Sequence, residues 1–149
     1  MVGFFIAMIS GALMSIQGVF NTDVTKSTSI WVAACFVQFT ALLMCIIMWL
    51  VDGRPEIMGL LGVPRKYALL GGVLGAFITY TVVRSMASLG TAKASLTIVI
   101  TQMAVAYLIE LFGVFGSKKP DFSWIKLVGL AVAIAGVFMF NMLGNQSES

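Results

Sequence analysis

Five long apolar runs constrain what this chain can fold into more than any other feature. They cover residues 2–21, 30–51, 67–86, 91–112 and 124–143. A helix that rises ~1.5 Å per residue needs about 20 apolar residues to cross the hydrocarbon core of a bilayer. Each run is therefore long enough to span a membrane. The sequence predicts an all-α integral membrane protein with five transmembrane helices.

The composition supports this prediction. The chain is 60% hydrophobic and 10% charged, with no histidine in 149 residues. These are too few polar residues to cover a soluble core of this size. The runs leave no room for a soluble catalytic or nucleic-acid-binding domain, so we expect a single transmembrane domain, 1–149. The net charge of +3 then reflects lysines and arginines that flank the membrane, and no nucleic-acid partner or cofactor is expected.

The start of the chain is interpreted as a retained span. The first run begins at residue 2 without a basic n-region or a clear cleavage site, which a signal peptide would show. With five spans, the two termini lie on opposite sides of the membrane. The N-terminal side is the more basic, with Arg54, Arg65, Lys66, Lys118, Lys119 and Lys126 against Lys26, Arg84 and Lys93. This bias predicts a cytoplasmic N-terminus.

Small residues recur at helical spacing in three of the runs. They are Gly3, Ala7, Gly11 and Gly18 in the first, Gly71, Gly72 and Gly75 in the third, and Gly129, Ala133 and Gly136 in the fifth. Such faces let helix backbones approach closely in lipid. Because one chain of this length is too small to enclose a pathway, we expect an antiparallel dimer.

Polar side chains inside the runs form the candidate substrate site. The candidates are Gln17, Asn21, Gln38, Tyr80, Thr101 and Gln102. Gln17 and Asn21 are four residues apart and share a helix face, whereas Gln38 and Gln102 fall near mid-depth. Buried amides need a partner, water or a ligand, so the set indicates a polar cavity. The alternative is that each residue makes an interhelical hydrogen bond, worth about 0.6 kcal/mol.

Two charged residues in the runs are candidates for coupling. Glu110 is the embedded acid that could carry a proton, and an embedded charge costs roughly 2.5–3.5 kcal/mol on insertion scales. A structural ion pair or a snorkelling acid explains Glu110 equally well. Arg84 could snorkel through its aliphatic stem. In an antiparallel dimer it could instead reach the depth of the partner's Glu110 and form a switching salt bridge.

Enzyme chemistry is poorly supported. The sequence has no histidine, no pair of carboxylates at one depth and no metal-ligand cluster. Two function classes remain, a small-molecule transporter and a non-transporting membrane subunit or scaffold whose polar residues only hold helices together.

Three stretches also carry a resemblance to a known family. They are Gly11 to Asn21, then Leu89-Gly90 followed by Thr101-Gln102 and by Ile109 to Gly116, and last Gly129 to Val137. The whole chain resembles the YdcZ-like family of the drug/metabolite transporter superfamily. The resemblance implies a half-transporter of the bacterial inner membrane that carries a small molecule. It also implies an antiparallel pair, formed with a second copy or with an oppositely inserted homologous partner.

The chain departs from the family pattern at two places. Ala87-Ser88 stands where Pro-Arg is common, and Thr101 stands where a glycine is usual. The first change leaves the end of the third span open. The second makes the fourth span less able to pack closely.

Overall fold

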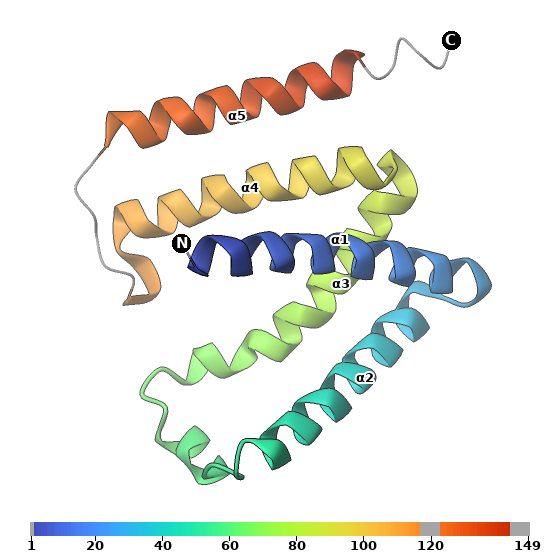
Figure 1. Ribbon diagram of the computed structural model, residues 1–149, viewed down its shortest axis with the longest axis vertical. Helices are drawn as coiled ribbons and strands as arrows, with labels where there is room; N and C mark the ends of the chain where they lie inside the picture. The colour runs from blue at the N-terminus through green and yellow to red at the C-terminus, as the bar shows by residue number, and fades with distance from the viewer. Residues whose placement is uncertain (1, 117–122, 144–149) are drawn as a thin grey trace. The chain divides into compact units, whose positions relative to one another are not determined.

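The computed structural model describes residues 2–116 and 123–143 and is helical throughout (Figure 1). The long helices are α1 (Val2–Ser27), α2 (Ile30–Val51), α3 (Gly71–Leu89), α4 (Thr91–Phe112) and α5 (Trp124–Leu143). Short 3-10 helices are η1 (Ile57–Gly62), η2 (Lys66–Leu70) and η3 (Val114–Gly116). Within the described ranges, five helices have the length and apolar composition to cross a membrane. The predicted all-helical membrane fold is confirmed to this extent.

The chain divides into two compact units, Met1–Ser88 and Leu89–Ser149. In the first unit, α1 and α2 pack together and are joined by a two-residue connection, which ends at the helix cap Ser29. The Ser29 hydroxyl accepts a hydrogen bond from the backbone N–H of Val32 at 3.3 Å. This bond satisfies one of the free donors at the start of α2.

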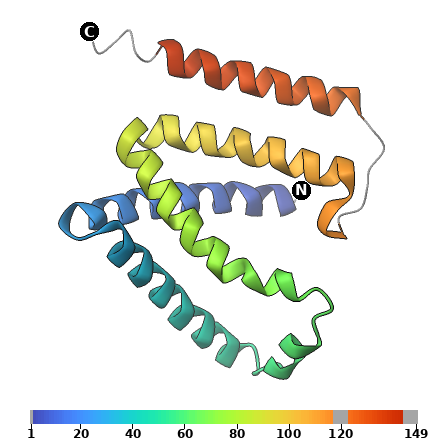
Figure 2. The ribbon, with the colours of Figure 1, turned by 180° about the vertical axis from the view of Figure 1, so that it is seen from behind.

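Helix α3 crosses α1 in both views of the ribbon (Figures 1 and 2). The end of the Met86 side chain lies over Gly18, where an added Cβ would be 2.5 Å from its Cε atom. Met86 and Val83 of α3 are buried, as are Ala33 and Ala34 of α2. The absence of a side chain at Gly18 therefore leaves room for Met86 of the crossing helix.

The observed end of α1 lies six residues beyond the end expected from the sequence. The polar composition of Asp23 to Ser29 predicts a turn, but the helix continues to Ser27. Its hydroxyls bond carbonyls one turn back, with Thr22 donating to Gly18 and Thr25 to Asn21, each at 2.8 Å. These local bonds satisfy the polar side chains without ending the helix.

Helix α3 also differs from its expected bounds of 67–86. Its α-helical part begins at Gly71, after the η2 turn, and ends at Leu89. Ala87 and Ser88 continue the helix, where a proline at this point would have stopped it. Gly90 then separates α3 from α4 with a φ of 80°, a left-handed value that glycine adopts without strain.

In the second unit, α4 and α5 run antiparallel and side by side (Figures 1 and 2). Gly113 ends α4 in the left-handed conformation, and its N–H bonds the carbonyls of Glu110 and Ile109. This is a common way for a helix to end.

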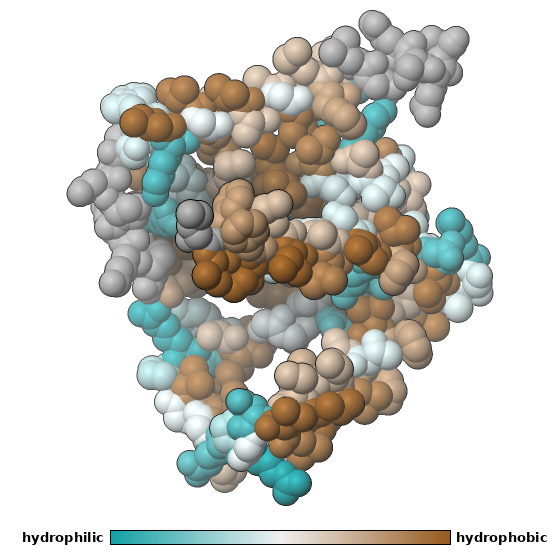
Figure 3. All heavy atoms as spheres, in the orientation of Figure 1, coloured by the Kyte–Doolittle hydropathy of each residue, from teal (hydrophilic) through white to brown (hydrophobic). Residues whose placement is uncertain are grey.

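Large apolar side chains cover the exposed helix faces. Phe4, Ile9 and Phe20 of α1 are about two-thirds exposed, at 69%, 60% and 64%. In Figure 3 the face of α1 toward the viewer is mostly brown, the apolar end of the scale. Apolar surface this extensive is what a lipid-facing helix presents.

Candidate functional site

A groove of about 860 Å³ lies between α1 and α2. Its polar lining residues are Gln17, Asn21, Asp23 and Thr40. Its apolar wall includes Leu13, Met14, Ile16, Phe20, Phe36 and Val37. The volume lies within the ~300–1,000 Å³ of typical small-molecule sites. The groove is therefore large enough for a small organic molecule.

Gln17 and Asn21 are the sequence-predicted residues that the structure brings together. They are one helical turn apart on α1, and both line the groove. Asn21 is buried, with 6% of its surface exposed, whereas Gln17 is exposed. Each amide offers two N–H donors and a carbonyl acceptor. The groove thus contains neutral hydrogen-bonding groups against an otherwise apolar wall.

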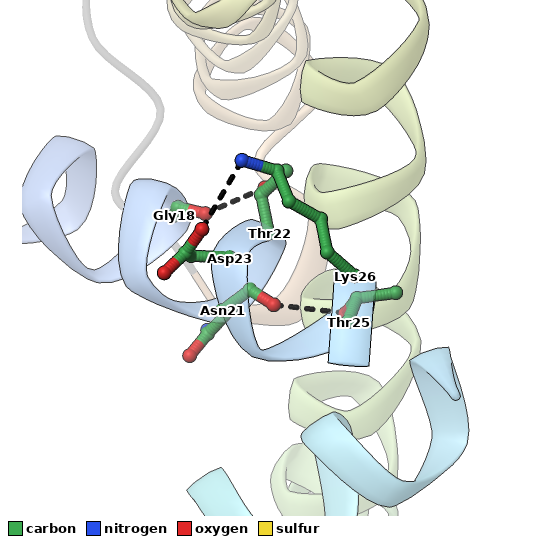
Figure 4. A network of polar contacts seen from close by, with 6 residues as sticks. All are labelled: Gly18, Asn21, Thr22, Asp23, Thr25 and Lys26. Carbon is green, nitrogen blue, oxygen red and sulfur yellow. Dashed lines mark hydrogen bonds and ion pairs between the residues drawn. The ribbon is translucent and has the colours of Figure 1, made fainter. Parts of the chain in front are cut away.

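Asp23 is the charged lining residue of the groove, and its partner is Lys26, which is not itself among the lining residues. The Lys26 Nζ atom lies 3.1 Å from Oδ1 of Asp23, one turn along α1 (Figure 4). Both side chains are about three-quarters exposed. An exposed ion pair of this kind contributes only about 0.2–1 kcal/mol. The pair can therefore open at low cost.

Gln38 and Tyr80 lie in contacts between α2 and α3 instead. The Nε2 atom of Gln38 is 2.9 Å from the position of a Cβ on Gly75, and the ring of Tyr80 stacks on Trp31 with a centroid distance of 4.9 Å. Neither residue is among those that line the groove. Both therefore contact residues of a neighbouring helix in the first unit, and their part in a substrate cavity stays a prediction.

Thr101 and Gln102 lie on α4, in the second unit, and both are exposed. The Thr101 hydroxyl donates to the carbonyl of Thr97 at 2.9 Å, and the Thr97 hydroxyl donates to that of Lys93 at 2.8 Å. The donor capacity of Thr101 is thus used inside its own helix. A contribution of Thr101 and Gln102 to substrate binding stays a prediction.

Glu110 has an ion-pair partner in its own chain. The Nζ atom of Lys126 on α5 lies 3.5 Å from Oε2 of Glu110 on α4, with each side chain about half exposed. This geometry matches the structural ion pair considered for Glu110 from the sequence. Arg84 is exposed on α3 of the first unit, and its coupling to the Glu110 of a partner stays a prediction.

Sequence reasoning missed three residues of these sites. Asp23 and Lys26 fall in a segment that is interpreted from the sequence as a turn. Lys126 is interpreted only as a charge that flanks the membrane. A signal existed for each. Asp23 and Lys26 have the i, i+3 spacing of a helical ion pair, and Glu110 and Lys126 end and begin consecutive spans on one side of the membrane. Among the described residues, no group of His, Cys, Asp and Glu could hold a metal ion.

Five apolar helices and a groove between two of them define the chain as a multi-pass membrane protein with a lateral groove. Residues 2–139 match the family described as "Putative inner membrane exporter, YdcZ". The chain belongs to this family, so the resemblance found in the sequence is confirmed, and the protein is an inner membrane protein of an exporter family. No curated protein and no solved structure matches the chain.

Proposed function

We propose that this protein exports a small molecule as one half of an antiparallel dimer, and that the groove between α1 and α2 forms part of its substrate cavity. The observation that carries the proposal is the position of Gln17 and Asn21 on one face of α1, lining a groove of about 860 Å³. Amides can orient a polar solute without the cost of an embedded charge. Gln38, Tyr80, Thr101 and Gln102 are not among the residues that line this groove, and their contribution to a cavity of the assembled dimer stays a prediction.

Open helix faces support the dimer. A Cβ placed on Gly3 or Gly11 of α1, or on Gly129 or Gly136 of α5, would meet no atom of the described chain within 4 Å. Faces of this kind allow another helix backbone to approach closely. In an antiparallel pair, the polar end of α1 in one subunit lies at the depth of the opposite helix end in its partner, as in transporters built from inverted repeats.

The competing function is a membrane subunit that does not transport. The contact of Gln38 with Gly75 favours it, because a glutamine packed on a glycine is already used to join two helices. In this alternative, the amides of α1 would also serve helix association in an assembly, and their loss would change stability without changing transport.

Export can be tested by growth of bacteria that express the chain. A panel of growth-inhibiting compounds with anionic, zwitterionic and cationic heads is applied to the wild type and to Gln17→Leu and Asn21→Leu. We expect the wild type to raise resistance to one class of compound. In each variant the gain in resistance should be at least tenfold smaller than in the wild type. Thr81→Val is the matched control, because the Thr81 hydroxyl bonds the carbonyl of Phe77 in its own helix at 2.9 Å.

The control should stay within twofold of the wild type, with equal amounts of each protein in the membrane. Resistance that is unchanged in both amide variants would remove the groove from the export pathway. Absence of any resistance would favour the non-transporting subunit.

The dimer can be tested by cross-linking at the two ends of α5. In a chain with Cys35→Ala and Cys45→Ala, copies carrying Ile125→Cys are mixed with copies carrying Asn141→Cys. Antiparallel pairing predicts disulfides between positions 125 and 141. Cross-links only between equal positions, or a monomer in lipid, would contradict antiparallel pairing.

A further inference from the structure

We infer that the groove between α1 and α2 binds an amphiphile drawn from the bilayer, with an apolar tail and a zwitterionic head that contains a primary ammonium. This inference rests on the proposed function, because it names the substrate class of the same groove. Three observations carry it, namely the depth of the groove in the membrane, its apolar part and the charges at its polar end.

The length of α1 places the groove across the boundary between hydrocarbon and headgroups. The helix has 26 residues and is about 39 Å long, whereas the hydrocarbon core measures about 30 Å. Its charged residues, Asp23 and Lys26, lie at the C-terminal end, so this end extends into the headgroup region. Trp31 begins α2 beside the same end, and indole rings settle at that level. A ligand of the groove must therefore be polar at one end only.

The apolar part of the groove is accessible from the lipid. Leu13, Phe20 and Phe36 line it, and each side chain is at least 60% exposed. Because these residues belong to the lipid-facing surfaces of α1 and α2, a molecule dissolved in the leaflet can enter sideways. Its tail can then pack against the groove wall without crossing water.

The polar end of the groove offers both signs of charge. The Asp23 carboxylate lines the groove, with Nζ of Lys26 3.1 Å away. An ammonium can donate to the Asp23 carboxylate, and a phosphate or carboxylate of the same head can accept from Lys26. The pair thus complements a zwitterion.

Heads of other chemistry fit less well. A purely cationic head would displace Lys26 from Asp23 and leave the lysine without a counter-ion, and a purely anionic head would face the carboxylate. A quaternary ammonium has no N–H to donate, so it cannot hydrogen-bond Asp23. A primary ammonium beside an anionic group is the head that complements both charges of the Asp23–Lys26 pair.

Tryptophan quenching by brominated lipids tests the inference. The full chain with Trp31, Trp49 and Trp124 changed to Phe receives Phe36→Trp as a reporter inside the groove. The protein is placed in phosphatidylcholine vesicles that contain a brominated probe lipid. Four probes share the same tails and carry an ethanolamine, a choline, a glycerol or a trimethylammonium head. Phe39→Trp is the matched control, because Phe39 lies on the same helix, is equally exposed and does not line the groove.

We expect the ethanolamine probe to associate with the groove reporter at least twofold more strongly than the choline, glycerol and trimethylammonium probes. Asp23→Asn should abolish this preference, and the Phe39→Trp reporter should show none. Equal quenching by all four heads, a stronger effect of a cationic or anionic head, or a preference that survives Asp23→Asn would overturn the inference. If Phe36→Trp fails to fold, Phe20→Trp serves as the reporter.

The binding experiment and the export experiment can reject the two hypotheses independently of each other. Loss of resistance in Gln17→Leu without any headgroup preference would leave the exporter intact and reject this substrate class. A headgroup preference in a chain whose amide variants export normally would reject the proposed function and leave a lipid-binding groove.

Discussion

At Gly18 the end of the Met86 side chain fills the space that a side chain on α1 would need. A Cβ there would lie 2.5 Å from Cε and 2.7 Å from Sδ of Met86, and 3.4 Å from Cγ1 of Val82. The nearest atoms are the far end of a flexible thioether chain, which can move aside. A small addition is therefore tolerated, and a large one is not.

We expect Gly18→Ala to change the free energy of unfolding little and Gly18→Leu to lower it by about 1–3 kcal/mol, the usual cost of overpacking. Met86→Ala in the same chain should recover part of that loss, because it vacates the space that the leucine needs. Thermal unfolding in mild detergent measures the effect. Gly72→Leu is the control, since no atom lies within 4 Å of its Cβ position. Equal losses at positions 18 and 72 would contradict the contact with Met86.

The ion pair between Glu110 and Lys126 can be tested by exchanging the two charges. Their atoms lie 3.5 Å apart between α4 and α5. We expect Glu110→Lys and Lys126→Glu each to lower the thermal midpoint, because each places like charges together, and the double exchange to restore most of it. The double exchange Arg84→Glu with Glu110→Arg distinguishes the coupling hypothesis. Recovery of export by that exchange alone would show that Glu110 acts with Arg84 of a partner.

At the scale of whole helices, the apolar runs predicted the membrane fold because lipid requires long apolar segments to be helical. The end of α1 was not predicted, because a polar segment can leave the hydrocarbon without leaving the helix. Thr22 and Thr25 bond carbonyls of their own helix, and Asp23 pairs with Lys26. The polar residues therefore indicate where α1 leaves the hydrocarbon. The end of the helix depends instead on its backbone hydrogen bonds, which continue beyond that point.

The candidate site was predictable in part for a related reason. Helical spacing alone places Gln17 and Asn21 on one face, and both line the groove. Helical spacing does not predict which other helix contacts a given face. It could therefore not show that Gln38 packs on Gly75 or that Tyr80 stacks on Trp31. It also cannot distinguish a hydroxyl that awaits a ligand from one that bonds its own helix.

Thr101 provides the test of that last distinction. Its hydroxyl donates to Thr97 within α4 at 2.9 Å. Such back-bonding contributes little to stability, so we expect Thr101→Val to leave the thermal midpoint unchanged, and export to fall only if this hydroxyl also contacts substrate. Gln17→Leu, measured in parallel, supplies the contrast. A tenfold loss of export in Thr101→Val at normal stability would mean that this hydroxyl contacts substrate.

For the molecule as a whole, the side on which the loops lie is a prediction from the charges. The loop after α2 carries Arg54, Arg65 and Lys66, and we expect it to be cytoplasmic in most copies. Single cysteines at Gly53 and at Ser29, in a chain without Cys35 and Cys45, are labelled in intact cells with a maleimide that cannot cross membranes. Label at 29 and not at 53 is the expected result. Predominant label at 53 would invert the topology, and equal label would show dual insertion.

The connections between helices leave the two membrane surfaces very unequal. On one side, Thr28 and Ser29 link α1 to α2, and Gly90 alone separates α3 from α4. On the other side, the chain from Asp52 to Leu70 separates α2 from α3, and the indole N–H of Trp49 in α2 donates to the Pro55 carbonyl in this segment. The first two connections are therefore too short to extend far beyond the helix ends. Among the connections between described helices, a soluble protein finds its longest accessible segment between Asp52 and Leu70.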